Sequence, residues 1–336
     1  MTRLISDAEV RAFIGMEAAI AAVSDAYASS AAGGLDASER TVAGVDGAAR
    51  LLTVAAGDRS YLLAQSYTGA PLGVDRNTSG FDRREKIYVV YDATSGACEA
   101  IVGGAYLSWL STGAMGAVAI DRLARRDARV LTIVGSGRQA HSALSGALAV
   151  RSWESVRVWS RDADRAERFC DEYPDVPGIA AVEDLRSSVG DSDVIITVTT
   201  SATPVVLGQW ISPGTHINSI GAHYPDRREL DAEAVARSTV FVDTRHQALR
   251  EKGELLLAVE EGRFHMRDIR AELGEVVAGT VGWTRTLDEV TLFASNGSPI
   301  ESLGSAIAVV RAFRADDSET QDFRFNDGPV AVGRIC

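Results

Sequence analysis

A glycine-rich loop near the middle of the chain has the spacing of a phosphate-binding turn. The run Gly135-Ser136-Gly137-Arg138-Gln139-Ala140 directly follows an apolar segment and opens a helical pattern. Gly135 permits a tight turn, Gly137 lets the backbone approach a pyrophosphate, and Ala140 keeps the helix close to the sheet. The diphosphate would lie on the helix N-terminus, where unpaired N–H groups converge. The loop therefore predicts a dinucleotide site at these six residues, with an incidental Gly-rich turn as the alternative.

The end of the next strand-like run indicates which dinucleotide is bound. An NAD site places an Asp or Glu there, which accepts hydrogen bonds from the ribose 2′-OH. Here the run ends Trp159-Ser160-Arg161-Asp162, so the acid comes one or two positions late. Arg161 could pair with a 2′-phosphate and Ser160 could donate to it, although Arg161 could also be an ordinary solvated arginine. We expect NADP(H), with NAD(H) as a possible cofactor.

The segments around this loop alternate between two periodicities. Helical patterns cover 139–150 and 163–173, and they lie among apolar, strand-like runs at 129–134, 156–159, 194–198, 216–220, 240–242 and 289–293. Such alternation is typical of an α/β fold whose parallel sheet carries helices on both faces. We therefore expect a Rossmann, doubly wound parallel sheet.

The first 120 residues follow another pattern. Ser6-Asp7-Ala8-Glu9 predicts a capping box that opens a helix reaching about residue 28. Short β-rich runs follow at 49–54, 61–67, 86–91 and 97–102, and helical periodicity covers 108–123 and 300–313. We expect residues 1–120, completed by 306–336, to form a discontinuous α+β domain that wraps around a nucleotide domain at 121–305.

Composition and charge restrict the partners. The 336 residues carry a net charge of −12 and no basic strip with interleaved aromatic residues, which argues against nucleic acid. No apolar run reaches the ~18 residues of a membrane span, and the first residues lack the apolar stretch of a signal peptide. Cys98, Cys170 and Cys336 have neither zinc nor disulfide spacing. We expect a cytoplasmic protein with a small-molecule substrate and no bound metal.

Eight short motifs in order give the chain a resemblance to the ornithine cyclodeaminase/mu-crystallin family. They are Arg40-Thr41-Val42, Asp92-Ala93-Thr94-Ser95-Gly96, Leu110-Ser111-Thr112-Gly113-Ala114, the loop at 133–140, Thr197-Val198-Thr199-Thr200-Ser201, His216-Ile217-Asn218-Ser219-Ile220-Gly221, Arg228-Glu229-Leu230-Asp231 and Thr291-Leu292-Phe293-Ala294-Ser295. The resemblance implies a Rossmann domain, a second domain that binds substrate and forms a homodimer, and an active site between them. The family includes cyclodeaminases, amino-acid dehydrogenases, ketimine reductases and near-inactive crystallins.

The same resemblance implies roles for residues on the substrate side. In members that handle amino acids, an arginine at the position of Arg40 binds the substrate carboxylate, and this chain keeps it. A lysine stands where this chain has Gln65, and a second arginine where it has Ser111. A carboxylate that enters a closed cleft needs fixed cations. The loss of two of the three predicts a neutral or singly anionic substrate that is not a free amino acid, in a pocket that includes Tyr67.

Further residues are expected to contact the cofactor. Thr199 and Ser201 follow the run 194–198 on the nucleotide side, Gly221 follows 216–220, and Ser295 matches a cofactor contact of the family. Thr112 is expected to open a helix of small residues that presents N–H groups to a phosphate. Close helix packing would also explain those small residues.

The predicted reaction is hydride transfer to a C=N bond, which also requires a proton for the nitrogen. His223 stands where cyclodeaminases have an aspartate, just beyond the run 216–220, at the rim where open α/β sheets bind ligands. Because histidine titrates near neutrality, His223 is the candidate proton donor, with a solvent-facing loop histidine as the alternative. We expect an NADPH-dependent imine or ketimine reductase. The alternatives are an amino-acid dehydrogenase or cyclodeaminase that uses bound NAD, and a crystallin-like NADPH-binding protein with little turnover.

Overall fold

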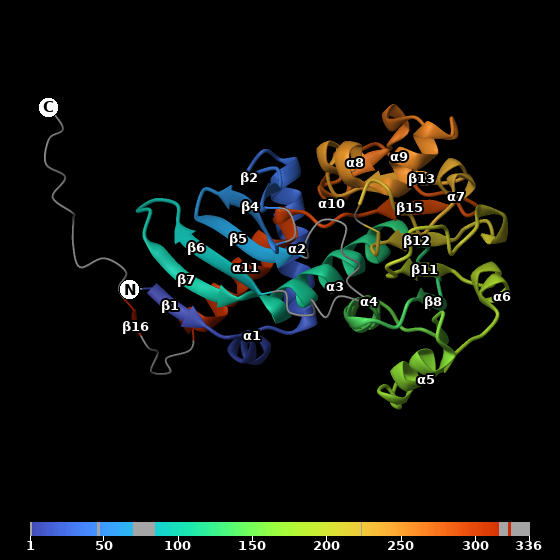
Figure 1. Cartoon of the computed structure of the whole chain (residues 1–336), viewed down its shortest axis with the longest axis horizontal. Helices are drawn as coiled ribbons and strands as arrows, with labels where there is room; N and C mark the ends of the chain where they lie inside the picture. Colours follow the sequence, from blue (N-terminus) through green and yellow to red (C-terminus); the bar gives the residue numbers. More distant parts are fainter. Residues whose placement is uncertain (1, 46–47, 70–84, 223, 316–321, 324–336) are drawn as a thin grey trace, which may run out of the picture.

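The described part of the chain forms two eight-stranded sheets, joined by a long helix (Figure 1). The computed structural model describes residues 2–45, 48–69, 85–222, 224–315 and 322–323. Within these ranges, no helix is long and apolar enough to cross a membrane.

The first sheet is built mainly from the N-terminal part of the chain. Its strand order is β16-β1-β7-β6-β5-β4-β2, with β3 also paired to β4. All of its described pairs are antiparallel except β1 with β7. The strands are β1 (Thr2–Ile5), β2 (Leu35–Ala37), β3 (Thr41–Ala43), β4 (Arg50–Asp58), β5 (Tyr61–Gly69), β6 (Lys86–Asp92), β7 (Cys98–Gly103) and β16 (Asp322–Phe323).

Helices from both ends of the chain cover the inner face of this sheet. They are α1 (Asp7–Phe13), α2 (Met16–Ala31), α3 (Gly104–Leu123) and α11 (Pro299–Ala315). The predicted capping box is present, with Ser6 accepting from the backbone of Glu9 and Glu9 bonding back to Ser6. The single helix expected to residue 28 is wrong, because the chain is extended at Ile14 and Gly15, which ends α1 and caps α2.

The second sheet has the order β10-β9-β8-β11-β12-β15-β13-β14, and every pair in it is parallel. The predicted doubly wound Rossmann sheet is therefore confirmed. Its strands are β8 (Val130–Val134), β9 (Ser155–Trp159), β10 (Ile179–Ala181), β11 (Val194–Thr197), β12 (His216–Ser219), β13 (Thr239–Val242), β14 (Ala271–Glu272) and β15 (Thr291–Ala294).

Helices pack on both faces of this sheet, because alternate strand residues point to opposite sides. In β11, Val194 and Ile196 join the apolar cluster that includes α4 and α5, whereas Ile195 joins the cluster beneath α6, α7 and α9. The helices are α4 (Arg138–Val150), α5 (Ala163–Asp171), α6 (Leu185–Gly190), α7 (Ala232–Ala236), α8 (Arg245–Glu251), α9 (Gly253–Glu260) and α10 (Leu273–Val277), with short 3₁₀ turns η1 (Gly208–Trp210) and η2 (Met266–Asp268).

Helix α3 runs from the first sheet to the second (Figure 1). It packs closely on α4, because a Cβ atom at Gly146 would collide with the carbonyl oxygen of Gly113. The Asn218 side chain of β12 donates to the carbonyl oxygen of Gly116 at 2.9 Å and ties α3 to the second sheet. The predicted domain boundaries at 120 and 305 fall inside α3 and α11. The division into domains stays a prediction.

Candidate functional site

The glycine-rich loop joins the carboxyl end of β8 to the N-terminus of α4. Gly135 has a φ of 121°, and a Cβ atom there would lie 2.9 Å from the carbonyl oxygen of Val198. Only glycine adopts this conformation without strain in so tight a turn. A Cβ atom at Gly137, by contrast, would meet no atom within 4 Å. Open space therefore adjoins the first N–H groups of a 13-residue helix, as a bound phosphate requires.

The rest of the loop also fits a dinucleotide. Ala140 is fully buried, and its N–H donates to the carbonyl oxygen of Gly137 at 2.8 Å. Gln139 has a buried side-chain oxygen that lacks a hydrogen-bond partner among the described residues. The Arg138 guanidinium donates to the carbonyl oxygen of Ala105 in α3, so this side chain already has a protein partner.

The residues after β9 are placed for a ribose or its phosphate. Asp162 caps α5, accepting from the backbone N–H of Arg165 at 3.4 Å, so its carboxylate serves the helix. Arg161 is exposed and makes no hydrogen bond or ion pair within the described part of the chain. The half-buried Ser160 accepts from the Asp162 backbone at 3.4 Å. This arrangement leaves a guanidinium, and no free carboxylate, at the strand end.

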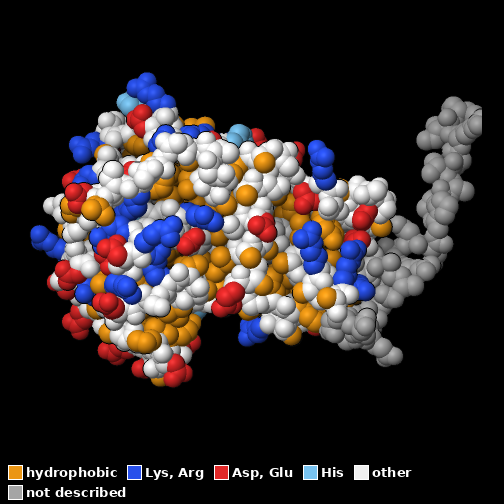
Figure 2. All heavy atoms as spheres, turned by 180° about the vertical axis from the view of Figure 1, so that it is seen from behind, with side chains coloured by type: hydrophobic (Ala, Val, Ile, Leu, Met, Phe, Trp, Pro, Cys, Tyr) orange, Lys and Arg blue, Asp and Glu red, His pale blue; other side chains and the backbone are white. Residues whose placement is uncertain are grey.

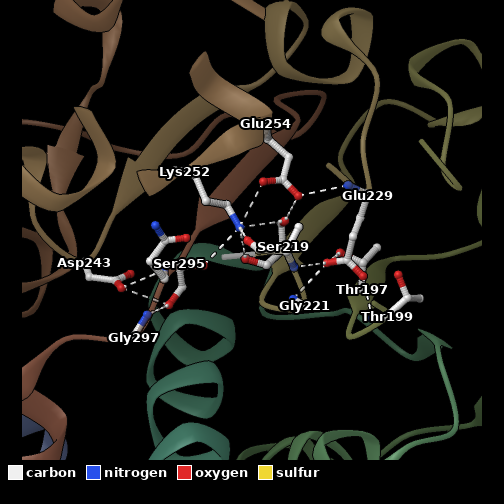
Figure 3. Close-up of polar contacts among 12 residues, drawn as sticks. Thr197, Thr199, Ser219, Gly221, Glu229, Asp243, Lys252, Glu254, Ser295 and Gly297 are labelled. Carbon is white, nitrogen blue, oxygen red and sulfur yellow. Dashed lines mark hydrogen bonds and ion pairs between the residues drawn. The ribbon is translucent and has the colours of Figure 1, made fainter. Parts of the chain in front are cut away.

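Buried Glu229 connects the loops that follow β11 and β12 (Figure 3). Its carboxylate accepts from the backbone N–H groups of Thr199, Gly221 and Ala222, the latter two at 2.8 and 3.2 Å. Burial, with a contribution from nearby Glu254, raises the pKa of the Glu229 carboxyl. Ser201 follows on the same loop, where its N–H donates to Thr199 Oγ1 at 3.1 Å. Thr199, Ser201 and Gly221 therefore lie together at the carboxyl edge of the sheet.

Lys252 fastens a second pair of loops at this edge. It is fully buried, and its ammonium donates to the carbonyl oxygens of Ser219, Ala222 and Ser295 at 3.0 to 3.1 Å. Its ion-pair partner is fully buried Glu254, 3.1 Å away. The ends of β12 and β15 are thus held by one cation between them (Figure 3). Sequence reasoning missed this pair, which falls at the junction of α8 and α9.

Two residues predicted to contact the cofactor have hydroxyl groups that are hydrogen-bonded within the protein. Ser295 is fully buried, and its hydroxyl donates to Asp243 at 3.0 Å and accepts from the N–H of Gly297 at 3.0 Å, so the side chain is not open to a ligand. Thr112 lies within α3 rather than at its start. Its hydroxyl donates to the carbonyl oxygen of Ser108 at 2.8 Å. The small residues after Thr112 serve the close packing of α3 on α4.

The predicted substrate-side residues lie on β5, on α3 and just before β3. Arg40, which precedes β3, pairs with Glu251 of α8 at 2.7 Å and so spans both parts of the protein. Gln65 is only 6% exposed, and its side-chain oxygen lacks a partner among the described residues. Ser111 is buried in α3, with its hydroxyl donating to the carbonyl oxygen of Ser108 at 3.3 Å. The candidate proton donor His223 lies outside the described residues.

Lys86 is a cation that the predicted pocket did not include. It starts β6, and its ammonium donates to the hydroxyl of Ser108 in α3 at 2.7 Å. The ammonium also lies 4.9 Å from the ring centre of Tyr67. Burial lowers the pKa of Lys86 to about 8. The charge of Glu301 opposes this shift, whereas the charges of Arg40 and Arg138 act in the same direction as burial. Lys86 therefore adds a second cation to Arg40 among the residues on the predicted substrate side.

Two buried carboxyl groups lie near these side chains. Glu301 accepts from the backbone and the hydroxyl of Ser298, both at 2.6 Å, and burial with the charge of Asp243 raises its pKa to about 7. Burial raises the pKa of Asp243 to about 6. Among the described residues, no group of three or more His, Cys, Asp or Glu side chains could hold a metal ion.

The comparison with known proteins identifies the family. Residues 1–316 match the ornithine cyclodeaminase/mu-crystallin family. This chain belongs to that family. The resemblance inferred from the motifs is confirmed.

Three similar proteins carry the names of reductases or a dehydrogenase, and a solved structure with 24% identity carries the name of a lysine cyclodeaminase. The ketimine reductase mu-crystallin of Rattus norvegicus is 36% identical over 219 residues, which cover 65% of this chain and 66% of that protein, just under two thirds of its length. A Thermococcus litoralis Δ1-pyrroline-2-carboxylate reductase, solved with NADH and L-proline, has a TM-score of 0.86 at 30% identity, covering 93% of this chain and 98% of that one. An archaeal alanine dehydrogenase dimer with bound NAD has a TM-score of 0.89 at 26% identity, covering 97% and 99%.

Proposed function

We propose that this protein is an NADPH-dependent oxidoreductase that reduces the C=N bond of a small imine or ketimine. The observation that carries the proposal is the phosphate-binding loop at 135–140, whose Arg138 lies near enough to Lys86 of the first sheet for their charges to interact. Two relatives named as reductases, of a ketimine and of a pyrroline carboxylate, support a C=N substrate.

The residues divide into those that hold the cofactor and those that fix the edge of the sheet. A bound nicotinamide would supply the hydride. The loop at 135–140 would bind the diphosphate with its backbone N–H groups, and Thr199, Ser201 and Gly221 would line the nicotinamide side. Glu229 and Lys252 keep the loops at this edge in one arrangement, which spares the enzyme their reorganisation at the moment of reaction.

His223 is the proposed proton donor to the imine nitrogen. The residue before it supports the proposal, because Ala222 is held through both its N–H and its carbonyl oxygen, by Glu229 and Lys252. Replacement of His223 by Ala should reduce kcat about 100-fold or more with little change in NADPH affinity. Unchanged turnover would remove His223 from the mechanism, and Tyr67 would become the next residue to replace.

The preference for NADPH over NADH rests on the end of β9. Arg161 is exposed there without a protein partner in the described ranges, while the carboxylate of Asp162 is engaged in capping α5. A guanidinium matches a 2′-phosphate in charge and geometry, whereas an unengaged carboxylate would favour a 2′-hydroxyl.

We also propose a homodimer formed by the outer face of the first sheet. Four large apolar side chains on this face are each 44–48% exposed, and pairing across the strands places them on the same side: Leu4, Leu51, Leu62 and Ile87. Such a patch is typical of an interface.

On the face in Figure 2, acidic and basic side chains are interspersed, with no continuous basic strip for nucleic acid. A cytoplasmic location is proposed from the scattered cysteines, of which Cys98 and Cys170 are free.

The decisive experiment follows absorbance at the nicotinamide band. Purified protein is incubated with NADPH and a panel of cyclic imines, then with NADH, and finally with L-ornithine, L-lysine or L-arginine plus NAD. Imine-dependent oxidation of NADPH is the expected result. Amino-acid-dependent formation of NADH would indicate a dehydrogenase, and ammonia release without an absorbance change would indicate a cyclodeaminase. Tight NADPH binding with no turnover would indicate a crystallin-like binder.

A further inference from the structure

Lys86 lies between the two positions where the pocket lacks a cation. One is Gln65 in β5, and the other is Ser111 in α3. Neither side chain can balance an anion in a closed cleft. The sequence does not reveal where the Lys86 side chain lies in space. Its position decides whether the pocket has a substitute for the two missing cations.

The strand register places Lys86 beside Gln65. Lys86 pairs with Tyr67, and Gln65 pairs with Tyr88, two residues further along each strand. Directly opposed residues in an antiparallel pair point to the same face, and so do residues two apart in one strand. Lys86 and Gln65 are therefore diagonal neighbours on the inner face, a relation that spans ~7–8 Å between Cα atoms. A long lysine side chain covers this distance.

The helix on the other side places Lys86 beside Ser111. The Lys86 ammonium is 2.7 Å from the hydroxyl of Ser108, and Ser111 follows Ser108 by one turn of α3. Residues three apart on a helix share a face. One ammonium thus lies between the strand position and the helix position that both lack a charge.

Lys86 keeps capacity for a ligand. Its ammonium has three donors, and within the described ranges it has one hydrogen-bond acceptor, Ser108, and no ion pair. Among the described residues, the two guanidinium groups whose charges act on Lys86 are already engaged, Arg40 with Glu251 and Arg138 with the Ala105 carbonyl oxygen. The charge of Glu301 acts on this ammonium, but among the described residues no carboxylate forms an ion pair with it, so it keeps donors for an anionic ligand.

We propose that Lys86 is a specificity-determining residue that binds a carboxylate of the substrate and selects singly anionic imines over neutral ones. The inference rests on the proposed function and adds a substrate class to it. One lysine on β6 would thus replace the strand and helix cations that this chain lacks. Of the two substrate classes expected from the sequence, neutral and singly anionic, the proposal selects the singly anionic one.

The test compares two ring imines that differ only in the carboxylate, 1-pyrroline and 1-pyrroline-2-carboxylate, with NADPH. The wild type is expected to prefer the carboxylate by kcat/KM. Lys86→Gln should lower kcat/KM for the carboxylate about 30-fold or more and change that for 1-pyrroline by less than about 3-fold. Arg122→Gln, which removes a positive charge from the exposed end of α3, is the control that should alter neither ratio.

A binding measurement separates this inference from the proposed function. Pyrrole-2-carboxylate, a planar and unreactive analogue, is titrated calorimetrically into each variant with NADP⁺. Binding that weakens about 30-fold in Lys86→Gln supports the role of Lys86 even if neither imine is reduced, in which case only the proposed reaction fails. Equal loss for both imines, or analogue binding unchanged in Lys86→Gln, overturns the inference. Absence of analogue binding to the wild type also overturns it.

Two further variants guard against a folding defect. Lys86→Arg keeps the charge and should retain the preference for the carboxylate. The double variant Gln65→Lys/Lys86→Gln moves the cation to the diagonal position on β5 and should recover at least about 10-fold of the lost preference. Melting temperature and NADPH affinity are measured for each. Loss of preference in Lys86→Arg at unchanged melting temperature would contradict a charge-based role.

Discussion

Replacement of Lys252 by Met is the most direct test of how the edge of the Rossmann sheet is held. Methionine keeps most of the apolar stem but removes the ammonium, which donates to three carbonyl oxygens and pairs with Glu254 at 3.1 Å. Because both partners of the ion pair are 0% exposed, the variant leaves an uncompensated carboxylate in the interior. Removal of one partner of such a pair costs ~3–5 kcal/mol.

The expected loss of stability is large enough for a thermal assay. At about 2 °C per kcal/mol, the lower value for domains of a few hundred residues, Lys252→Met should melt ~6–10 °C below the wild type. Because the three carbonyls belong to Ser219, Ala222 and Ser295, the variant should also bind NADPH more weakly. Circular dichroism gives the melting temperature, and fluorescence titration gives the cofactor affinity.

Two comparisons sharpen the result. Lys252→Met/Glu254→Gln removes both charges, so it should melt higher than Lys252→Met alone despite the additional substitution. Arg267→Met removes a cation from an exposed pair with Asp268, 3.9 Å away, and should change stability by less than about 1 kcal/mol. A difference of about 1 kcal/mol or less in the free energy of unfolding corresponds to melting temperatures within about 2 °C. If Lys252→Met melted that close to Arg267→Met, the buried pair of Lys252 and Glu254 would not hold the edge of the sheet.

Three further predictions concern the cofactor loop, the ribose end and a buried carboxyl group. Gly135→Ala should lower both the melting temperature and the NADPH affinity, because φ is 121° and the carbonyl oxygen of Val198 would lie 2.9 Å from the new Cβ atom. Gly137→Ala, whose Cβ atom meets nothing within 4 Å, should lower the NADPH affinity alone. Equal melting temperatures for the two variants would contradict the strain argument. Arg161→Ala should raise the KM for NADPH ~10–100-fold with little effect on NADH, and an equal effect on both would exclude the phosphate contact. Burial raises the pKa of Glu301 from 4.5 to about 7, so the folded state binds its proton more tightly and stability falls as pH rises between these values. Glu301→Gln should remove up to about 3 kcal/mol of this loss of unfolding free energy between low and high pH. Urea unfolding at pH 5 and pH 8 measures the loss in both proteins. The same loss in the variant as in the wild type would refute the raised pKa of Glu301.

Much of the fold could be predicted because local patterns coincide with tertiary requirements. The Rossmann strands are nearly continuous apolar runs, as strands covered on both faces must be, and the loop at 135–140 joins one of them to a helix. The errors fall where local periodicity continues through a break. The pattern from residue 7 to about 28 spans Gly15, where extended backbone separates α1 from α2. The same applies at Gly104, where α3 begins four residues before the predicted start at 108.

The site was only partly predictable, because sequence position and spatial position differ most for long side chains. The backbone-binding residues at 135–140 and Gly221 follow from the strand ends, which the fold fixes. Ser295 could not be judged from its motif, since only the structure shows that its hydroxyl faces Asp243. Lys252 gave no signal either, because a lone lysine between two helical patterns is usually solvated.

The charge balance of the pocket shows why a count of residues along the chain can mislead. Gln65 and Ser111 are 46 residues apart in sequence, yet β5, β6 and α3 bring both within reach of one lysine that aligns with neither. A bound carboxylate responds to the electrostatic field at its own position, and side chains from several strands or helices can place a cation there. Loss of a charge at one position therefore predicts a changed substrate only after the neighbouring strands have been searched for a substitute. Here the strand register supplies one, and the choice between a neutral and an anionic imine depends on Lys86.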